Sequence, residues 1–276
     1  MYLSKFAGPL VSERSHMTPP TGLGRGYEPR DFDAEPFGSV VPPFAVPEIP
    51  RSEWADRIEE RERHKSKLRD LKVWRGFRSL NQQQTSYCWA NGVVAGMHYA
   101  RPVAGLPHVD LSPASVAAPI KGYRNVGGWG SQAVAYIVKN GVAPQSVWPA
   151  NAIEPKYDNE ESRQARKQYR IVEFEEAKPN SFAALATALL SGFPVAIGLR
   201  WWGHLVIAHD LLKIGRDAFA TEIDNSWGSG WGDLGHGVLT EEKSLPDEAT
   251  VIRFILPEDV GPKMVGLNPT QPTRLR

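Results

Sequence analysis

The stretch Asn81–Ala100, NQQQTSYCWANGVVAGMHYA, contains Cys88, which is the only cysteine among the 276 residues of the chain. Polar residues typical of a loop precede the cysteine, and small and apolar residues recur at helical spacing after it. The pattern therefore predicts a buried helix that begins close to Cys88. The N-terminus of a helix lowers the pKa of a thiol, and only the thiolate attacks a carbonyl carbon.

A single cysteine also has a simpler interpretation. Free cysteines are often small buried apolar residues without chemical function. The choice between the two interpretations depends on whether other segments supply the groups that activate a thiol. One candidate group is close in sequence, because Gln82 lies six positions ahead of Cys88.

The overall composition excludes several classes of partner. The chain has 32 Lys and Arg against 31 Asp and Glu, a net charge of +1, so neither nucleic acid nor an anionic membrane is indicated. One cysteine excludes an intramolecular disulfide and fits a reducing compartment. No apolar segment is long enough for a signal peptide or a membrane span. We expect a soluble protein without a visible export signal.

The chain divides into three parts by composition. Residues 1–47 are rich in proline and glycine and have no helical or strand period, which predicts an extended arm. Residues 48–256 carry the periodic segments and are expected to form one domain, with a charged helix over 52–72. Residues 257–276 form a polar C-terminal tail.

Helical patterns dominate the first part of the domain and strand patterns the second. Helices are predicted from Ser112, over Ser131–Lys139 and, with a serine cap, over Ser181–Leu190. The predicted strands are Phe193–Leu199, His204–Ile214, Ala218–Ile223, Gly237–Thr240 and Val251–Leu256. Helices followed by strands predict an α+β protein of two subdomains with a cleft between them.

The strand half contains the groups that activate a thiol in other proteins. His204 and His209 are five apart in one predicted strand, so they face opposite sides and at most one points at a given cleft. Asn225 follows the next strand in the segment IDNSWGSGWG. An asparagine that accepts a hydrogen bond from an imidazole fixes its tautomer and orients the ring. Alternatively, the tryptophan-glycine segment is only a tight turn over the core.

Taken together, these segments resemble the papain-like cysteine peptidases, in a bacterial or phage-type form. The resemblance covers roughly residues 48–256, with the motifs in the order of that family. They are Asn81-Gln82, Cys88-Trp89, Leu111-Ser112, Gly127-Gly128, Trp148-Pro149, Asn225-Ser226-Trp227-Gly228 and Gly230-Trp231-Gly232. The fold that the resemblance implies has a helical left subdomain, an antiparallel β-barrel-like right subdomain and an active-site cleft between them.

The resemblance also implies a catalytic set. Cys88 would be the nucleophile, and Gln82 with the Cys88 backbone N–H would form the oxyanion hole. For the histidine the family pattern favours His209, because Gly215 lies six positions on and Asn225 follows after a short hairpin. In this assignment Asn225 orients the imidazole of His209.

Substrate contacts follow from the same resemblance. Gly127 and Gly128 would bind an extended substrate backbone, and Trp227 would cover the histidine and asparagine. Trp129 and Ala208 would border an apolar pocket for the second residue before the cut. The resemblance implies no metal and no cofactor.

Some positions depart from the family. Thr85, Ser86 and Tyr87 stand where it usually has a cysteine, a glycine and a small residue, and the sequence leaves open whether the Tyr87 ring crowds the cleft. The arm is too short for the long helical pro-segment of secreted members. Its segment 27–32 is similar to a short arm in bacterial and phage-encoded relatives, and the helix over 52–72 reads as an insertion.

The sequence therefore predicts a papain-like cysteine endopeptidase that acts on polypeptides, in the cytoplasm of a bacterial or phage-infected cell or on a virion. A second hypothesis is a structural or binding component of a larger assembly such as a phage particle, with the arm and the tail as docking elements. A third is an amide-bond enzyme that is not a protease. Asn225 argues against the third, because such enzymes commonly use aspartate as the third residue.

Overall fold

The computed structural model describes residues 22–32 and 47–256. The C-terminal tail and most of the predicted arm lie outside these residues. The helices are α2 (Arg51–Arg63), α3 (Leu68–Arg75), α4 (Cys88–Val103), α5 (Ala114–Ile120), α6 (Gly130–Asn140), η2 (Pro155–Tyr157), α7 (Glu160–Arg166) and α8 (Phe182–Leu190). The strands are β1 (Arg170–Glu176), β2 (Val195–Leu199), β3 (His204–Lys213), β4 (Phe219–Asp224), β5 (His236–Thr240) and β6 (Glu248–Leu256).

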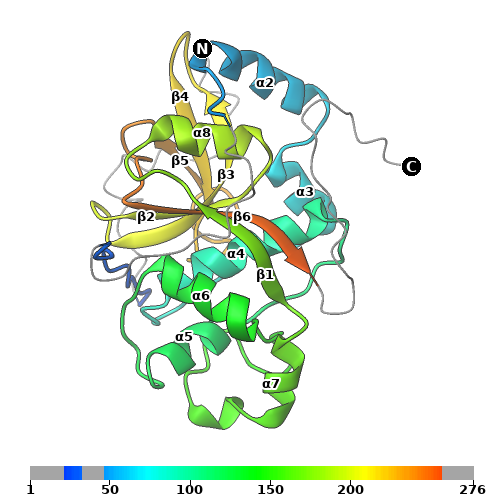
Figure 1. The fold of residues 1–276 in the computed structure, drawn as a ribbon, viewed down its shortest axis with the longest axis vertical. Helices are drawn as coiled ribbons and strands as arrows, with labels where there is room; N and C mark the ends of the chain where they lie inside the picture. Colours follow the sequence, from blue (N-terminus) through cyan, green and yellow to red (C-terminus); the bar gives the residue numbers. More distant parts are fainter. Residues whose placement is uncertain (1–21, 33–46, 257–276) are drawn as a thin grey trace.

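The strands form one sheet that separates two cores. Its order is β1-β6-β2-β3-β4-β5, and every neighbouring pair is antiparallel. Leu205 and Ile207 of β3 pack on one face with α4 and the other helices of the left subdomain. Val206 and Ala208 pack on the opposite face with α8 and α2. The predicted α+β organisation in two subdomains is confirmed (Figure 1).

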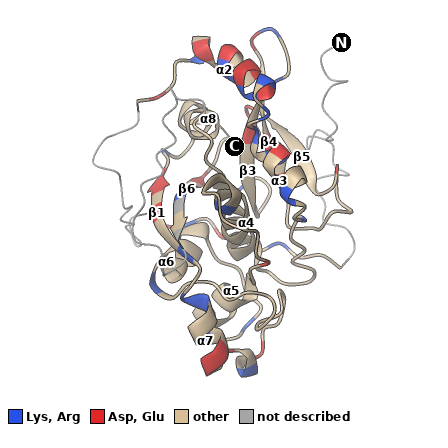
Figure 2. Cartoon of the chain, turned by 90° about the vertical axis from the view of Figure 1, so that its right-hand side faces the viewer, with Lys and Arg blue, Asp and Glu red and all other residues tan. Residues whose placement is uncertain are grey.

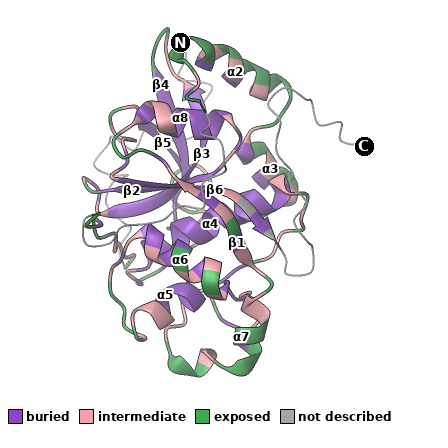
Figure 3. Cartoon of the chain, in the orientation of Figure 1, coloured by how far each residue is buried: buried purple, intermediate pink, exposed green. Residues whose placement is uncertain are grey.

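Helix α4 is the buried helix that the sequence predicts, and it begins at Cys88. All but its last residue are buried (Figure 3). A Cβ on Gly92 would lie 2.3 Å from Leu205 Cδ2, and one on Gly96 would lie 2.3 Å from Ile252 Cδ1. The two glycines therefore let the helix lie directly against the sheet, as their spacing indicates.

The other predicted elements are largely found, with small shifts at their ends. Ser181 caps α8, because its hydroxyl accepts a hydrogen bond from Ala184 N at 3.1 Å. Gly141, with φ of 81°, ends α6. Strand β1 was not predicted, since its sequence RIVEFEE has no clean alternation of apolar and polar residues.

The prediction of a single charged helix over 52–72 is wrong, because this segment forms two helices. Helix α2 ends at Arg63, and Lys65 adopts a left-handed conformation with φ of 49°. Helix α3 then begins where Asp210 accepts hydrogen bonds from Leu68 N (3.1 Å) and Arg69 N (3.0 Å). Because a distant strand supplies this cap, the local sequence pattern does not predict where α3 begins.

Helix α2 carries its charges on the side away from the core (Figure 2). Its two buried residues are Trp54 and Ile58. Trp54 makes edge contacts with Phe182 of α8 and Phe219 of β4, with ring centroids 5.7 and 5.2 Å apart. The charge run thus belongs to a solvated helix face, as expected. No helix in the described parts of the chain is long and apolar enough to cross a membrane.

Candidate active site

Cys88 is the first residue of α4, and its thiol is free and completely buried. Burial raises the pKa of the thiol to about 12. Backbone hydrogen bonds act in the opposite direction, first from Leu205 of β3 and then from Gly26, Trp89 and Tyr27. The thiol therefore lies between the start of α4, the start of β3 and the segment 22–32.

The histidine that pairs with Asn225 is His204, not His209. His204 Nε2 lies 2.7 Å from Asn225 Oδ1, and the imidazole stacks on Trp227 with centroids 4.7 Å apart. His204 is also next to Leu205, whose backbone bonds the thiol. Its second nitrogen, Nδ1, is buried and has no hydrogen-bond partner in the described part of the chain. Burial lowers the pKa of His204 to about 4, against the hydrogen bond to Asn225, which raises it.

His209 lies on the other face of the sheet, so the expected contact with Asn225 is absent. Its ring stacks on Tyr99 of α4 with centroids 5.1 Å apart. Nδ1 lies 2.9 Å from Asp210 Oδ2 and Nε2 lies 3.0 Å from His236 Nδ1. Both ring nitrogens are therefore occupied. Strand alternation puts His209 on the face that meets α4, and the pairing of β3 with β4 brings the start of β3, not His209, next to Asn225.

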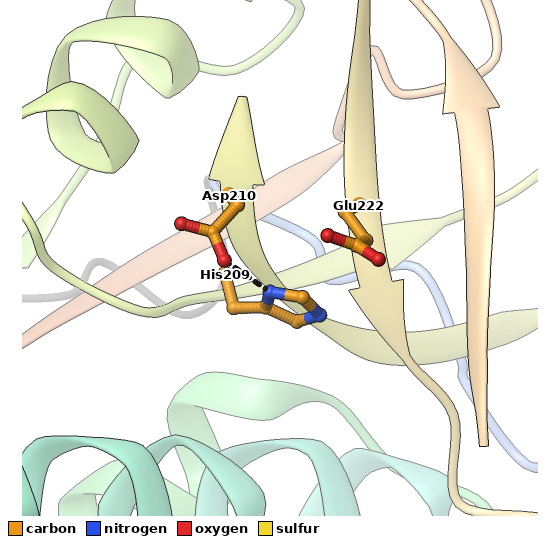
Figure 4. Close-up of side chains that lie close together, drawn as sticks. All are labelled: His209, Asp210 and Glu222. Atoms are coloured by element: carbon orange, nitrogen blue, oxygen red, sulfur yellow. Dashed lines mark hydrogen bonds and ion pairs between the residues drawn. The ribbon is translucent and has the colours of Figure 1, made fainter. Parts of the chain in front are cut away.

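The carboxylates near His209 are engaged in a buried ionic network (Figure 4). Atoms of His209, Asp210 and Glu222 lie within 4.8 Å of one another, which is a spacing suited to a metal ion. However, the guanidinium of Arg69 pairs with Glu222, and that of Arg61 lies 3.5 Å from Asp210. Since cations of the chain already compensate these carboxylates, the cluster fits a structural network better than a metal site.

Asp210 remains ionised within this network. Burial raises its pKa, but the hydrogen bond and charge of His209, the charge of Arg61 and the backbone of Arg69 outweigh burial, so the pKa is lowered. Asp210 thus caps α3 and binds His209 at the same time. It joins α3 to the sheet.

Gln82 is held in place by hydrogen bonds between two loops, its own and the loop that contains Ser226. Gln82 N donates to Ser226 O at 2.8 Å, and Ser226 Oγ donates to Gln82 Oε1 at 2.5 Å. The side-chain amide nitrogen then donates to Thr85 O at 2.8 Å and to Gly24 O at 3.0 Å. The sequence predicts Gln82, but it does not predict Ser226 as the residue that orients its amide.

The arm segment 22–32 lies across Gln82, Gly128 and Trp227. Tyr27 and Gly128 form a parallel bridge, in which Gly26 O accepts from Gly128 N at 2.8 Å and Glu28 N donates to Gly128 O at 2.9 Å. Gly24 O also accepts from Trp227 Nε1 at 3.1 Å. The double glycine expected to bind a substrate backbone thus binds the backbone of the arm.

Two glycines allow the arm to lie this close. A Cβ on Gly24 would be 2.3 Å from Thr85 O, and a Cβ on Gly26 would be 2.0 Å from Ser86 O. These are backbone atoms, which cannot yield without a shift of the loop ahead of Cys88. Backbone groups of Gly26 and Tyr27 bond the thiol, and a bond that lowers a thiol pKa comes from an N–H donor. The backbone of the arm therefore lies next to the sulfur and opposes the effect of burial on its pKa.

The remaining predicted contacts divide into two groups. Gly127 and Gly128 contact the arm, and a Cβ on Gly127 would lie 2.7 Å from Gly26 O. Trp129 is half-buried at the start of α6, with Lys121 5.1 Å from its ring. Ala208 does not border a pocket beside the thiol. It pairs with Val195 and packs in the core behind the sheet, because its selection depended on His209.

Tyr87 does not crowd the cleft. Its side chain is buried, its hydroxyl donates to Arg124 O at 2.9 Å, and its ring makes an edge contact with Trp89 at 6.2 Å. The bulky residue ahead of Cys88 therefore packs in the core of the left subdomain.

No family model matches the sequence, and a comparison with curated proteins finds no match either. Solved structures do resemble the fold. Xylellain, a cysteine protease from Xylella fastidiosa, is 18% identical with a TM-score of 0.59, and the match covers 84% of this chain and 96% of xylellain. Bromelain from Ananas comosus, solved with the E64 inhibitor, is 18% identical with a TM-score of 0.52 over 63% of this chain and 92% of bromelain.

A third solved structure gives a similar result. Digestive procathepsin L 3 from the larval midgut of Tenebrio molitor is 18% identical with a TM-score of 0.54, and the match covers 63% of this chain. The chain spans just under two thirds, 65%, of that protein. These neighbours are papain-like cysteine proteases, and the fold of this chain is therefore papain-like.

Proposed function

We propose that this chain is a cysteine peptidase in which Cys88, His204 and Asn225 form the catalytic triad. The observation that carries the proposal is the 2.7 Å hydrogen bond between His204 Nε2 and Asn225 Oδ1. Nδ1 of the ring has no hydrogen-bond partner among the described residues. The backbone of the next residue, Leu205, bonds the thiol of Cys88. His204 replaces His209 in the set predicted from sequence.

The proposed reaction follows from these groups. His204 Nδ1 takes the proton of the Cys88 thiol, and the thiolate attacks the carbonyl carbon of a peptide bond to form a C–S bond. The amide nitrogen of Gln82 donates to the oxyanion. The imidazolium of His204 then protonates the leaving amine as the C–N bond breaks. Water, deprotonated by the same imidazole, hydrolyses the thioester and regenerates the thiol.

The structure with the arm in place represents a resting form in this proposal. A thiol pKa of about 12 and an imidazole pKa of about 4 mean that Cys88 and His204 are both neutral near pH 7. Gly24 O accepts a hydrogen bond from the side-chain amide of Gln82, and the backbone of the arm is hydrogen-bonded to the backbone of Gly128. A polypeptide substrate would take both positions once the arm has left, and renewed access of water would favour the thiolate–imidazolium pair.

The test uses the full chain in two forms, wild type and Gly26→Ala, in which the added Cβ meets Ser86 O at 2.0 Å. Each is incubated with a peptide library and with a thiol-directed epoxide, and cleavage and labelling are followed by mass spectrometry. We expect cleavage and labelling in Gly26→Ala, slower reactions in wild type, and neither in Cys88→Ala. Gly230→Ala is the matched control, because nothing lies within 4 Å of that Cβ position. Absence of cleavage in every form would refute the peptidase proposal.

A further inference from the structure

A small hollow lies where the end of α6, helix α7 and the start of β1 meet, at the lower end of the view in Figure 1. Its volume is about 230 Å³, below the range of about 300–1,000 Å³ that is usual for drug-sized ligands, so a ligand would have to be compact. No apolar or aromatic side chain of the described residues lines it. Five of the lining side chains are cationic and one is a carboxylate, namely Lys139, Arg163, Arg166, Lys167 and Arg170 against Glu160.

A glycine allows the elements around the hollow to meet. Gly141 directly follows α6, and a Cβ on it would lie 1.8 Å from Arg166 O and 3.1 Å from Tyr169 O. Val142 N, one residue further on, donates to Tyr169 O at 2.9 Å. The chain after α7 therefore lies directly against the end of α6, and this contact brings cations from three elements to one place.

The carboxylates nearby do not balance this positive charge. Asp158 is shared between Arg163, whose Nε lies 2.9 Å from Oδ1, and Arg166, whose Nη1 lies 3.7 Å from the same oxygen. Lys139 and Lys167 have no carboxylate partner within the described parts of the chain, and Lys167 Nζ donates only to an amide oxygen of α7. Since the whole chain has a net charge of only +1, the excess of positive charge is a local feature.

One cation of the hollow is held in a fixed position. Arg166 Nη1 donates to the hydroxyl oxygen of Tyr136 at 2.7 Å, and the guanidinium carbon lies 5.6 Å from the centroid of that ring. The side chain of Arg166 is only 13% exposed. This is its only side-chain hydrogen bond to the described residues, so further N–H groups of the planar guanidinium can bind an oxyanion.

We propose that the hollow binds a compact oxyanion with several negative charges, of the class of inorganic polyphosphates. Guanidinium and ammonium groups form strong charge-assisted hydrogen bonds with phosphate oxygens. A nucleobase would find no aromatic ring to stack on, and the side chains of an acidic peptide would find no apolar surface. The phosphate groups alone would therefore be recognised. The proposal does not depend on the peptidase function, because none of these residues belongs to the proposed triad.

The binding test uses the full chain and sodium tripolyphosphate in isothermal titration calorimetry at low ionic strength, where charges are weakly screened. We expect saturable binding at one site. The double variant Lys139→Gln/Lys167→Gln should raise Kd at least about tenfold, because it removes the two cations that lack a carboxylate partner. Lys65→Gln/Lys178→Gln is the matched control, which changes the net charge equally outside the hollow and should change Kd less than about twofold. Equal weakening in both double variants would reduce the binding to general electrostatic attraction and overturn the site.

A second variant tests the geometry at constant charge. Tyr136→Phe removes only the hydroxyl that holds Arg166, so Kd should rise at least about threefold. An unchanged Kd would refute a built site. ATP should bind no more tightly than tripolyphosphate, and tighter binding of ATP would overturn recognition by phosphate alone. Binding of hexaglutamate without binding of tripolyphosphate would assign the hollow to an acidic peptide instead. Thermal unfolding of each variant checks that it is folded.

Discussion

His204 Nε2 and Asn225 Oδ1 lie 2.7 Å apart, although 21 positions separate the two residues in the sequence. The hairpin of β3 and β4 brings them together, since His204 begins β3 and Asn225 directly follows β4. Trp227 covers the imidazole. The group that would activate a thiol is therefore preorganised by the sheet, whereas a separate segment, the arm, lies against the thiol.

The two histidines should respond differently to substitution. In the Gly26→Ala background, His204→Ala should lower the rate of peptide cleavage by about 10²–10⁴, the usual contribution of a general base. His209→Ala should leave the reactivity of the thiol nearly unchanged, because its ring nitrogens bond Asp210 and His236. The measurements are kcat/KM and the rate of epoxide labelling.

Stability provides the control for this pair of variants. His209→Ala leaves buried groups of Asp210 and His236 without their partner, which should lower the free energy of unfolding by about 1–3 kcal/mol. Urea unfolding of both variants measures this effect. If His209→Ala instead abolished labelling in a folded protein, the assignment of His204 would be refuted.

The choice between the histidines illustrates what the sequence could and could not determine. Alternation along a strand correctly separated His204 from His209, but it does not say which of the two lies beside Asn225. In the sheet, Ile207 pairs with Asp224 and Lys213 with Phe219, with an irregularity between Ala208 and Asp210. A residue near the start of β3 therefore comes next to Asn225.

The arm could not be predicted as an occupant of the site. Its glycines and prolines predict an extended segment but contain no signal for where it docks. Gly24 and Gly26 are needed only because Thr85 and Ser86 of a distant loop lie against them. The assembly role and the cellular location inferred from sequence stay predictions.

The orientation of Gln82 should contribute to the rate. In Gly26→Ala, Gln82→Ala should lower kcat by about 10²–10³ through loss of one oxyanion donor. Ser226→Ala removes the hydroxyl that bonds Gln82 Oε1 at 2.5 Å and should cause a smaller loss. Because the donor itself remains, KM should change little. An effect of Ser226→Ala as large as that of Gln82→Ala would show that the hydroxyl does more than orient the amide.

Labelling of Cys88 should depend on pH in a way that reports the arm. In wild type the thiol pKa of about 12 makes the thiolate fraction rise about tenfold per pH unit between pH 7 and 9, and the epoxide labelling rate should rise with it. In Gly26→Ala a thiolate paired with protonated His204 should give a nearly constant rate over the same range. A constant rate in wild type would mean that the arm opens without this substitution.

Buried histidines should make the protein sensitive to mild acid. Burial lowers the pKa of His98 to about 3, of His204 to about 4 and of His236 to about 2. An unfolded histidine takes up a proton near pH 6.5, whereas these three stay neutral in the folded state, so their contribution to stability is present above pH 6.5 and is lost as the pH falls towards their folded pKa values. Between pH 6.5 and 5.5 each should remove about 1 kcal/mol from the free energy of unfolding, about 3 kcal/mol in all.

His98 offers the sharpest check of this acid sensitivity, since its Nε2 accepts a hydrogen bond from Leu111 N at 3.1 Å and must be neutral to do so. Glutamine also accepts such a bond but does not titrate, so His98→Gln should reduce the loss between pH 6.5 and 5.5 by about 1 kcal/mol. Urea unfolding followed by the fluorescence of the nine tryptophans measures both values. An unchanged pH dependence in a folded His98→Gln protein would mean that His98 is protonated in the native state, and Leu111 N would then need another acceptor.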